Sequence, residues 1–184
     1  MRVIAGSAKG RRLQAPAGMD TRPITDRIKE SLFNILAPDI EGADFLDLFA
    51  GSGGVGIEAL SRGARQAVFV DNSRKAAAVL AANLKHCDLE QHADLRLDDA
   101  IRAIKKLERE GRQFDIIYVD PPFTNAAIFS EVMAVLDRAD ILASMGKMVI
   151  RSHRKMDMPE KLTQLERYRL KEYGESVLHF YRKI

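Results

Sequence analysis

Two short segments, about 70 residues apart, carry residue types suited to chemistry on a bound ligand. The first is a glycine-rich run that opens on an acid, Asp47-Leu48-Phe49-Ala50-Gly51-Ser52-Gly53-Gly54-Val55-Gly56. The second is Asp120-Pro121-Pro122-Phe123. The first contains the end of an apolar run typical of a buried strand and the second directly follows another such run, and ligands of open α/β sheets bind beyond the carboxyl ends of the strands. Together the two segments predict a ligand site.

The glycine run suits a nucleoside cofactor. Glycine lets the backbone turn sharply and lets a ligand approach without a Cβ in the way. Asp71 ends the next expected strand 20 residues after Gly51, where its carboxylate could accept hydrogen bonds from both ribose hydroxyls. Gly51, Gly53 and Gly56 followed by an acid also satisfy the dinucleotide-binding pattern, and a purely structural turn is a third interpretation.

The acid that opens the run argues against a pyrophosphate ligand. Asp47 would repel phosphate but could pair, directly or through water, with the cationic end of a methionine moiety. Asp99 follows a third expected strand and could reach the adenine amino group; Asp98 competes for this role, and Asp99 could instead cap the next helix. We therefore expect S-adenosylmethionine, bound by Asp47, Phe49, Ala50, Gly51, Ser52, Gly53, Gly56, Asp71, Asn72, Asp99 and Ala100.

The Asp-Pro-Pro-Phe segment suits methyl transfer to an exocyclic amine of a base. Such an amine is a poor nucleophile because its lone pair is delocalised into the ring. Two acceptors aimed at its N–H groups, the Asp120 carboxylate and the Pro121 carbonyl, could draw the lone pair out of conjugation. Pro122 stiffens the turn, and Phe123 offers a face for stacking to an unpaired or flipped base. A strand end with a core phenylalanine is the alternative interpretation.

The elements around these segments predict an α/β fold. A basic β-hairpin is expected from Met1–Ala5 and Arg11–Gln14, then a helix capped by Thr25 that ends before Pro38. Further helices are expected at 55–62, 73–85 and 128–136, with one through Ile101, Ile104 and Leu107. Strands are expected at 45–49, 67–70, 94–97, 114–119, 147–151, 167–173 and 176–183. This outline is the Rossmann-like class I methyltransferase fold: a mostly parallel seven-stranded sheet with one antiparallel strand and helices on both faces.

Length, composition and charge indicate what kind of protein has this fold. A length of 184 residues suits a single domain, with 1–42 as a basic hairpin and helix extension and 43–184 as the catalytic core. Cys87 stands alone and no stretch is apolar enough to cross a bilayer, so we expect a cytoplasmic protein without disulfides. Net charge is +2 over 1–42, −4 over 43–146 and +5 over 147–184, which suits an acidic pocket edged by phosphate-binding surface or ordinary solvated faces.

The whole chain resembles the bacterial RsmD-type methyltransferases. The resemblance rests on the two ligand segments and on the runs Met1-Arg2-Val3-Ile4-Ala5-Gly6, Lys9-Gly10-Arg11, Thr21-Arg22-Pro23, Asp26-Arg27, Lys29-Glu30, Leu32-Phe33-Asn34 and Glu58-Ala59-Leu60-Ser61-Arg62-Gly63-Ala64. It implies methylation of guanine N2 in 16S ribosomal RNA within small-subunit particles. Phe123 stands where the family more often has Tyr, and Ile24 where Thr is usual, which leaves fine substrate positioning open.

Several cations are candidates for RNA contact: Arg2, Lys9, Arg11, Arg12, Arg22 and Arg27. Arg22 and Arg27 could equally contact the cofactor carboxylate or pair with Asp26 and Glu30 at the helix start. The four histidines lack metal-like spacing, so we expect no metal, and a monomer is the default. Alternative functions are a DNA adenine-N6 or cytosine-N4 methyltransferase, a nicotinamide-dependent oxidoreductase, and a non-catalytic RNA-binding assembly factor.

Overall fold

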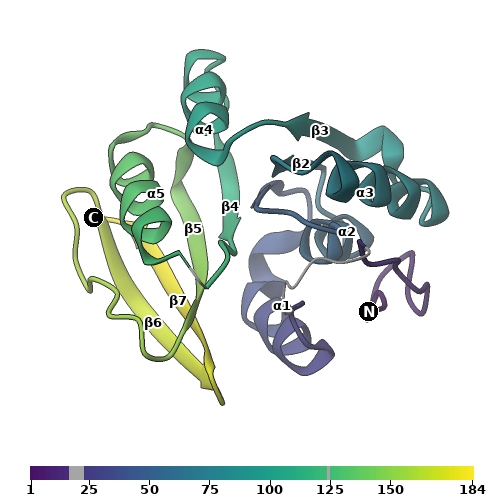
Figure 1. Cartoon of the computed structure of the whole chain (residues 1–184), viewed down its shortest axis with the longest axis horizontal. Coiled ribbons are helices and arrows are strands. Elements are labelled where there is room, and N and C mark those ends of the chain that lie inside the picture. Colours follow the sequence, from purple (N-terminus) through teal and green to yellow (C-terminus); the bar gives the residue numbers. More distant parts are fainter. Residues whose placement is uncertain (17–22, 124) are drawn as a thin grey trace.

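The computed structural model describes residues 1–16, 23–123 and 125–184. Its centre is a seven-stranded sheet in the order β3-β2-β1-β4-β5-β7-β6 (Figure 1). The strands are β1 (Asp44–Leu48), β2 (Gln66–Asp71), β3 (Ala93–Leu97), β4 (Phe114–Val119), β5 (Leu142–His153), β6 (Leu165–Tyr173) and β7 (Ser176–Lys183). The helices are α1 (Asp26–Ile40), α2 (Gly54–Ser61), α3 (Arg74–His86), α4 (Ala100–Arg109) and α5 (Ala126–Arg138), with a short 3-10 turn at Glu90–His92.

Strand direction follows the expected topology. Strands β1 to β5 pair in parallel, whereas β7 runs antiparallel to both of its neighbours, β5 and β6. The prediction of a mostly parallel seven-stranded sheet with one reversed strand is therefore confirmed, as are the alternating helices that connect the parallel strands.

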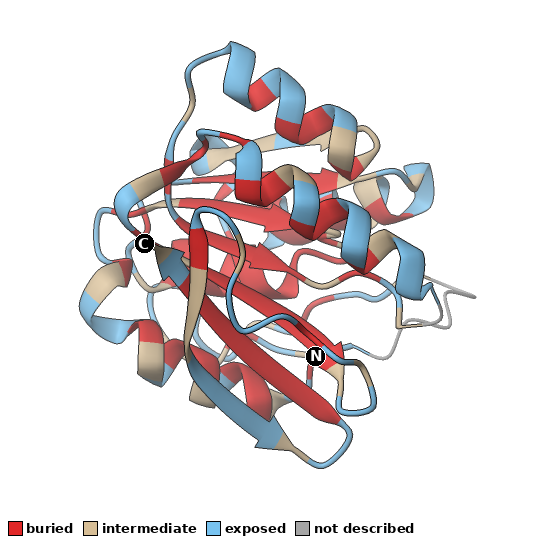
Figure 2. Ribbon diagram, turned by 90° about the vertical axis from the view of Figure 1, so that its left-hand side faces the viewer, coloured by how far each residue is buried: buried red, intermediate tan, exposed pale blue. Residues whose placement is uncertain are grey.

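Helices cover both faces of the sheet because the central strands are apolar on both faces. Phe45, Phe69 and Tyr118 pack against α1, α2 and α3 in one buried cluster. Their neighbours along the strands, such as Leu46 and Val68, point the other way and pack against α4 and α5. Figure 2 shows the result: the strands at the centre are buried, while the helices expose their outer sides.

Helix α1 differs from the expectation that it ends before Pro38. It continues to Ile40 with Pro38 inside it. A proline in the last turn removes a single backbone donor, and the buried side chains of Leu36 and Ile40 hold that turn against the core. The prediction of its end was therefore wrong.

The two N-terminal segments also differ from the expected hairpin. They lie antiparallel and are joined by one bridge, between Arg2 and Arg12, and by backbone hydrogen bonds from Val3 to Arg11, from Gly10 to Val3 and from Leu13 to Met1, but neither segment forms a strand. The first segment also bonds to α2. Two of its backbone amides donate to the buried Glu58 carboxylate, at 2.8 and 3.0 Å.

No helix in the described part of the chain is long and apolar enough to cross a membrane.

Candidate active site

The glycine loop and the Asp-Pro-Pro-Phe turn leave neighbouring strands at the same edge of the sheet. Strands β1 and β4 are paired in parallel, with Leu48 opposite Val119. The next residue of β4, Asp120, donates its backbone N–H to the Leu48 carbonyl at 3.3 Å. Asp71 ends the strand on one side of this pair, and Arg151 lies near the end of the strand on the other side. Four strand ends therefore meet at one place.

Glycine has two different tasks in the loop. Gly51 has a φ of +56°, and a Cβ placed there would meet nothing within 4 Å, so the loop is open on that side. Gly53 and Gly56 instead permit close packing: a Cβ would lie 2.1 Å from Leu80 at Gly53 and 2.3 Å from the Phe69 ring at Gly56. The structure therefore leaves room for a ligand at Gly51 and gives the other two glycines a packing role.

Asp71 ties the glycine loop to the end of β2. Its two carboxylate oxygens accept the backbone N–H groups of Gly51 and Ser73, each at 2.8 Å. A carboxylate oxygen has a second lone pair, so each can still accept a ribose hydroxyl. Asn72 is exposed beside it.

Asp47 lies underneath the loop. Only 2% of the residue is exposed, and its carboxylate accepts the Gly56 N–H at 2.9 Å. Burial raises the pKa of Asp47 to about 8, against the opposing effect of the Gly56 hydrogen bond, and the nearby carboxylates of Asp120 and Asp71 raise it further. Three acids thus surround the loop, and their residue types fit a ligand that carries positive charge and a ribose.

The carboxylate of Asp120 is held by two partners. Arg151 Nη1 donates to Asp120 Oδ2 at 2.8 Å, and the Tyr118 hydroxyl donates to the same oxygen at 3.2 Å. Burial raises the pKa of Asp120, while the Arg151 charge and the two hydrogen bonds oppose the rise. The carboxylate is still reachable, since 19% of the side chain is exposed. Pro121 beside it is buried and Pro122 is exposed.

The chain is similar to known proteins along its whole length. The chain matches the family described as Conserved hypothetical protein 95 over residues 1–182. It is 41% identical to YlbH of Bacillus subtilis, covering 100% of this chain and 99% of that one. It is 33% identical to Ribosomal RNA small subunit methyltransferase D of Escherichia coli, covering 100% of this chain and 90% of that one. The solved structure of yhhF from Escherichia coli superposes with a TM-score of 0.87 at 33% identity, covering 100% of this chain and 97% of that chain.

The chain belongs to this family. The resemblance to the RsmD-type methyltransferases is thereby confirmed. The match extends from residue 1 to residue 182, so it includes the whole seven-stranded sheet and the loops at its edge.

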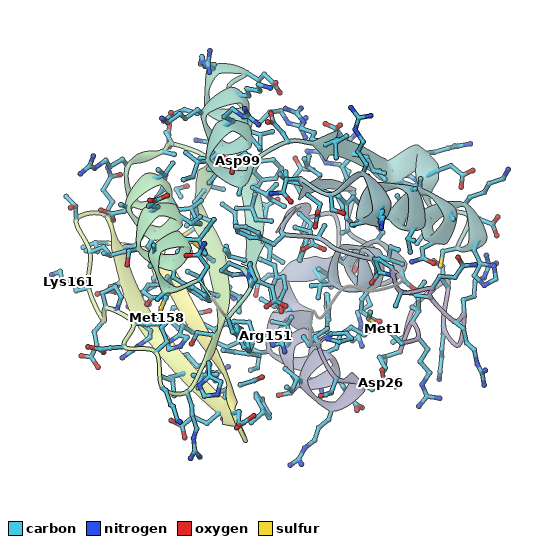
Figure 3. The ribbon with its side chains drawn as sticks, in the orientation of Figure 1. Met1, Asp26, Asp99, Arg151, Met158 and Lys161 are labelled. Atoms are coloured by element: carbon cyan, nitrogen blue, oxygen red, sulfur yellow. The ribbon has the colours of Figure 1, made fainter. Side chains whose placement is uncertain are left out.

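Two residues of this family member that the sequence interpretation missed hold the site together. Arg151, labelled near the middle of Figure 3, directly follows the buried apolar run Met148-Val149-Ile150 of β5, and a cation at the end of such a run is a signal that could have found it. Asn83 on α3 is 1% exposed and binds both the Ser52 carbonyl, at 2.9 Å, and the backbone of Gln14. Its partners are 31 and 69 residues away in sequence, so no local pattern announces it.

The two acids at the start of α4 have separate tasks. Asp99 accepts the N–H groups of Ile101 and Arg102 at 3.0 and 3.2 Å, which is the N-cap role left open by the sequence. Asp98 pairs with Arg102 and with Lys106. Ala100 is buried in the first turn of the helix. Contact of Asp99 with an adenine remains a prediction.

Candidate RNA-binding cations differ in how far they are already engaged. Arg2 pairs with Asp26 at 3.1 Å. Arg11 pairs with Asp88 at 2.7 Å. The side chains of three others are exposed: Lys9, Arg12 and Arg27. Arg22 lies outside the described residues.

Beside the Asp-Pro-Pro-Phe turn lies a hollow of about 600 Å³ between α5 and the loop after β5. Phe123 forms part of its wall, and the ring of His153 meets the Phe123 ring edge-on at 6.2 Å. The other lining side chains are mainly apolar and include Phe129, Met133, Met156 and Leu162. Among the described residues, no group of three histidines, cysteines or acids could hold a metal ion.

Proposed function

We propose that this protein transfers a methyl group from S-adenosylmethionine to the exocyclic N2 amine of a guanine in 16S ribosomal RNA. The observation that carries the proposal is the placement of the Asp120 turn directly beside the glycine loop, on paired strands of one sheet. A relative that is 33% identical over the whole chain is named for methylation of ribosomal RNA of the small subunit.

The residues of the site divide the work between cofactor and base. When bound, S-adenosylmethionine supplies an electrophilic methyl group on a sulfonium and becomes S-adenosylhomocysteine on transfer. Asp71 would hold the ribose hydroxyls, and the open backbone at Gly51 would let the cofactor lie against the loop. Asp71 and Asp120 lie near Asp47, and a cationic ligand beside them would favour the ionised form of Asp47, whose pKa is raised to about 8.

The catalytic turn would prepare the amine. Asp120 and the Pro121 carbonyl accept its two N–H groups, which turns the lone pair toward the methyl group. Phe123 stacks on the base, an interaction of about 1–3 kcal/mol per base. As the new N–C bond forms, the nitrogen becomes positive, and the surplus proton leaves to Asp120 or to water. Binding needs an unpaired base, because a paired base cannot reach the turn.

The remaining parts of the chain would recognise the substrate. We place RNA backbone contacts on the exposed Lys9, Arg12 and Arg27 of the extension 1–42, while 43–184 forms the catalytic core. Arg2 and Arg11 can join them once RNA phosphate competes with their partners. The substrate would be the small-subunit particle, met in the cytoplasm by a monomeric enzyme.

Methyl transfer from labelled cofactor tests the proposal. Small subunits from a strain that lacks the family enzyme should accept label on guanine N2. Asp120→Ala should lower kcat by about 10²–10³-fold, the usual cost of losing a polar group aimed at developing charge. Asp115→Ala is the matched control, since Asp115 lies exposed in the same strand and should keep its activity.

Each other outcome rejects a defined part of the proposal. Label found only in DNA would reject the RNA substrate and keep the chemistry. An inert wild-type protein that still binds small subunits would favour an assembly factor. Equal activity of Asp120→Ala and wild type would remove the turn from the mechanism.

A further inference from the structure

Arg151 contacts both functional halves of the catalytic turn at once. Its guanidinium donates to Asp120 Oδ2 at 2.8 Å, and its central carbon lies 5.1 Å from the centroid of the Phe123 ring. One side chain therefore touches the acceptor for the amine and the face for the base. We propose that Arg151 is a positioning residue for methyl transfer, which fixes Asp120 and Phe123 relative to each other and keeps Asp120 ionised.

The sheet puts Arg151 in this position. Strands β4 and β5 pair in parallel with Val119 opposite Ile150, so the residues that follow, Asp120 and Arg151, extend from the same edge. Only 3% of the Arg151 side chain is exposed. A buried cation is tolerated where an opposite charge and hydrogen bonds compensate for lost hydration, and Asp120 provides both. The pair is thus preformed in the protein without substrate.

Guanidinium geometry suits this double contact better than an ammonium would. The planar group can donate in its plane to a carboxylate while its face lies over an aromatic ring. Phe123 is held on another side by the edge of His153, so its orientation is set by two neighbours. A misplaced stacking face would move the base relative to Asp120, and a displacement of about 1 Å can cost about 100-fold in rate.

The second consequence of the contact is that Arg151 affects the ionisation of Asp120. An amine donor needs the ionised carboxylate as its acceptor, so transfer should rise with pH as Asp120 loses its proton. The groups that face Asp120 are Arg151 from β5, Tyr118 from β4 and Asp47 from β1. Arg151, by its charge and its hydrogen bond, and Tyr118, by its hydrogen bond, oppose the rise in the pKa of Asp120 that burial causes. Without Arg151, the pKa of Asp120 should be higher and the acidic limb of the rate profile should move to higher pH.

Three variants test the inference, which rests on the proposed function. Arg151→Met keeps most of the length of the side chain but loses the positive charge and the planar set of N–H donors. Arg151→Lys keeps the charge but loses the planar donors. Arg167→Met is the matched control, because Arg167 is also poorly exposed at 14%, is paired with Glu160 and lies on β6 away from the turn. For each protein, kcat and KM for small subunits are measured from acidic to alkaline pH, together with Tm and the affinity for S-adenosylhomocysteine.

Arg151→Met should lower kcat about 100-fold near neutral pH, shift the acidic limb to higher pH and leave S-adenosylhomocysteine affinity unchanged. Arg151→Lys should keep the limb in place and recover part of kcat. Arg167→Met should lower Tm without moving the limb. A uniform loss at every pH in Arg151→Met, equal to that in Arg167→Met, would overturn the inference.

A measurement without turnover separates the inference from the proposed function. The carboxyl carbon of Asp120 can be followed by NMR in free protein that carries labelled aspartate, with Asp120→Asn to assign the signal. Arg151→Met should raise the pKa of this carboxyl group. Equal values in the variant and wild type would overturn the inference even if wild type methylates RNA, whereas failure of wild-type transfer alone would reject the proposed function.

Discussion

At the scale of single residues, Asp47 shows a conflict between the stability of the fold and the binding of a ligand. Burial raises its pKa from 3.8 to about 8. An acid with a higher pKa in the folded state keeps a proton that the unfolded chain has lost, so stability falls as pH rises between these two values. A cationic ligand beside Asp47 would favour its ionised form. The buried acid that lowers the stability of the fold can therefore contribute to ligand binding.

Asp47→Asn separates the two effects. The amide oxygen can still accept the Gly56 N–H but no longer ionises. We expect the free energy of unfolding of the variant, relative to wild type, to increase as pH rises from 3.8 to about 8. Affinity for S-adenosylmethionine should fall. Denaturant unfolding at several pH values and calorimetric titration measure the two; a pH-independent difference in stability would contradict the raised pKa.

At the scale of elements, a buried ion cluster fastens the N-terminal extension to the core. Glu58 on α2 accepts two backbone amides of the extension and pairs with Lys29 of α1 and Arg62. The side chains of Glu58 and Lys29 are both fully buried. Lys29 also donates to the Arg2 carbonyl at 2.5 Å, so one cluster joins two helices and the first segment of the chain.

Glu58→Gln should therefore destabilise the protein by about 3–5 kcal/mol, the usual cost of leaving a buried charge without its partner. The double variant Glu58→Gln/Lys29→Met should recover part of this loss, because it removes the orphaned cation as well. Denaturant unfolding gives the stability, and hydrogen exchange at the amides of Ile4 and Ala5 reports whether the extension loosens. Unchanged exchange there would show that Glu58 does not hold the extension.

Elements with local signals could be predicted from the sequence, and long-range partners could not. The two ligand loops were placed correctly at one edge because apolar strands, glycine and proline mark them locally. The two strands of the N-terminal hairpin are not confirmed: backbone hydrogen bonds join the two segments, but the first segment also donates two amides to Glu58, more than 50 residues away. The extent of α1 was wrong because tertiary burial of Ile40 outweighs the local effect of Pro38. Arg151 and Asn83 act across similar separations.

At the scale of the whole molecule, basic residues stand at both ends of the sheet. The N-terminal extension bonds to α2 and α3, on the side of β1 and β2, whereas β6 forms the opposite edge (Figure 1). Lys9 and Arg12 are exposed on the first side, and Arg169 and Lys171 are exposed on β6. An RNA substrate that binds across the catalytic edge near the extension should contact Lys9 and Arg12 and not Arg169 and Lys171.

Lys9→Ala/Arg12→Ala therefore tests where RNA lies, with Arg169→Ala/Lys171→Ala as a control of equal charge. Each phosphate contact contributes about 0.7–0.9 to the slope of log affinity against log salt, so losing two should lower the magnitude of the slope by about 1.4–1.8. We expect this for the N-terminal pair alone, with weaker binding of small subunits at low salt and an unchanged kcat at saturation. A fall in kcat in the N-terminal double variant would mean that the extension shapes the active site. Equal slopes in the two double variants would mean that the molecule attracts RNA by its net charge of +3 and not by a defined face.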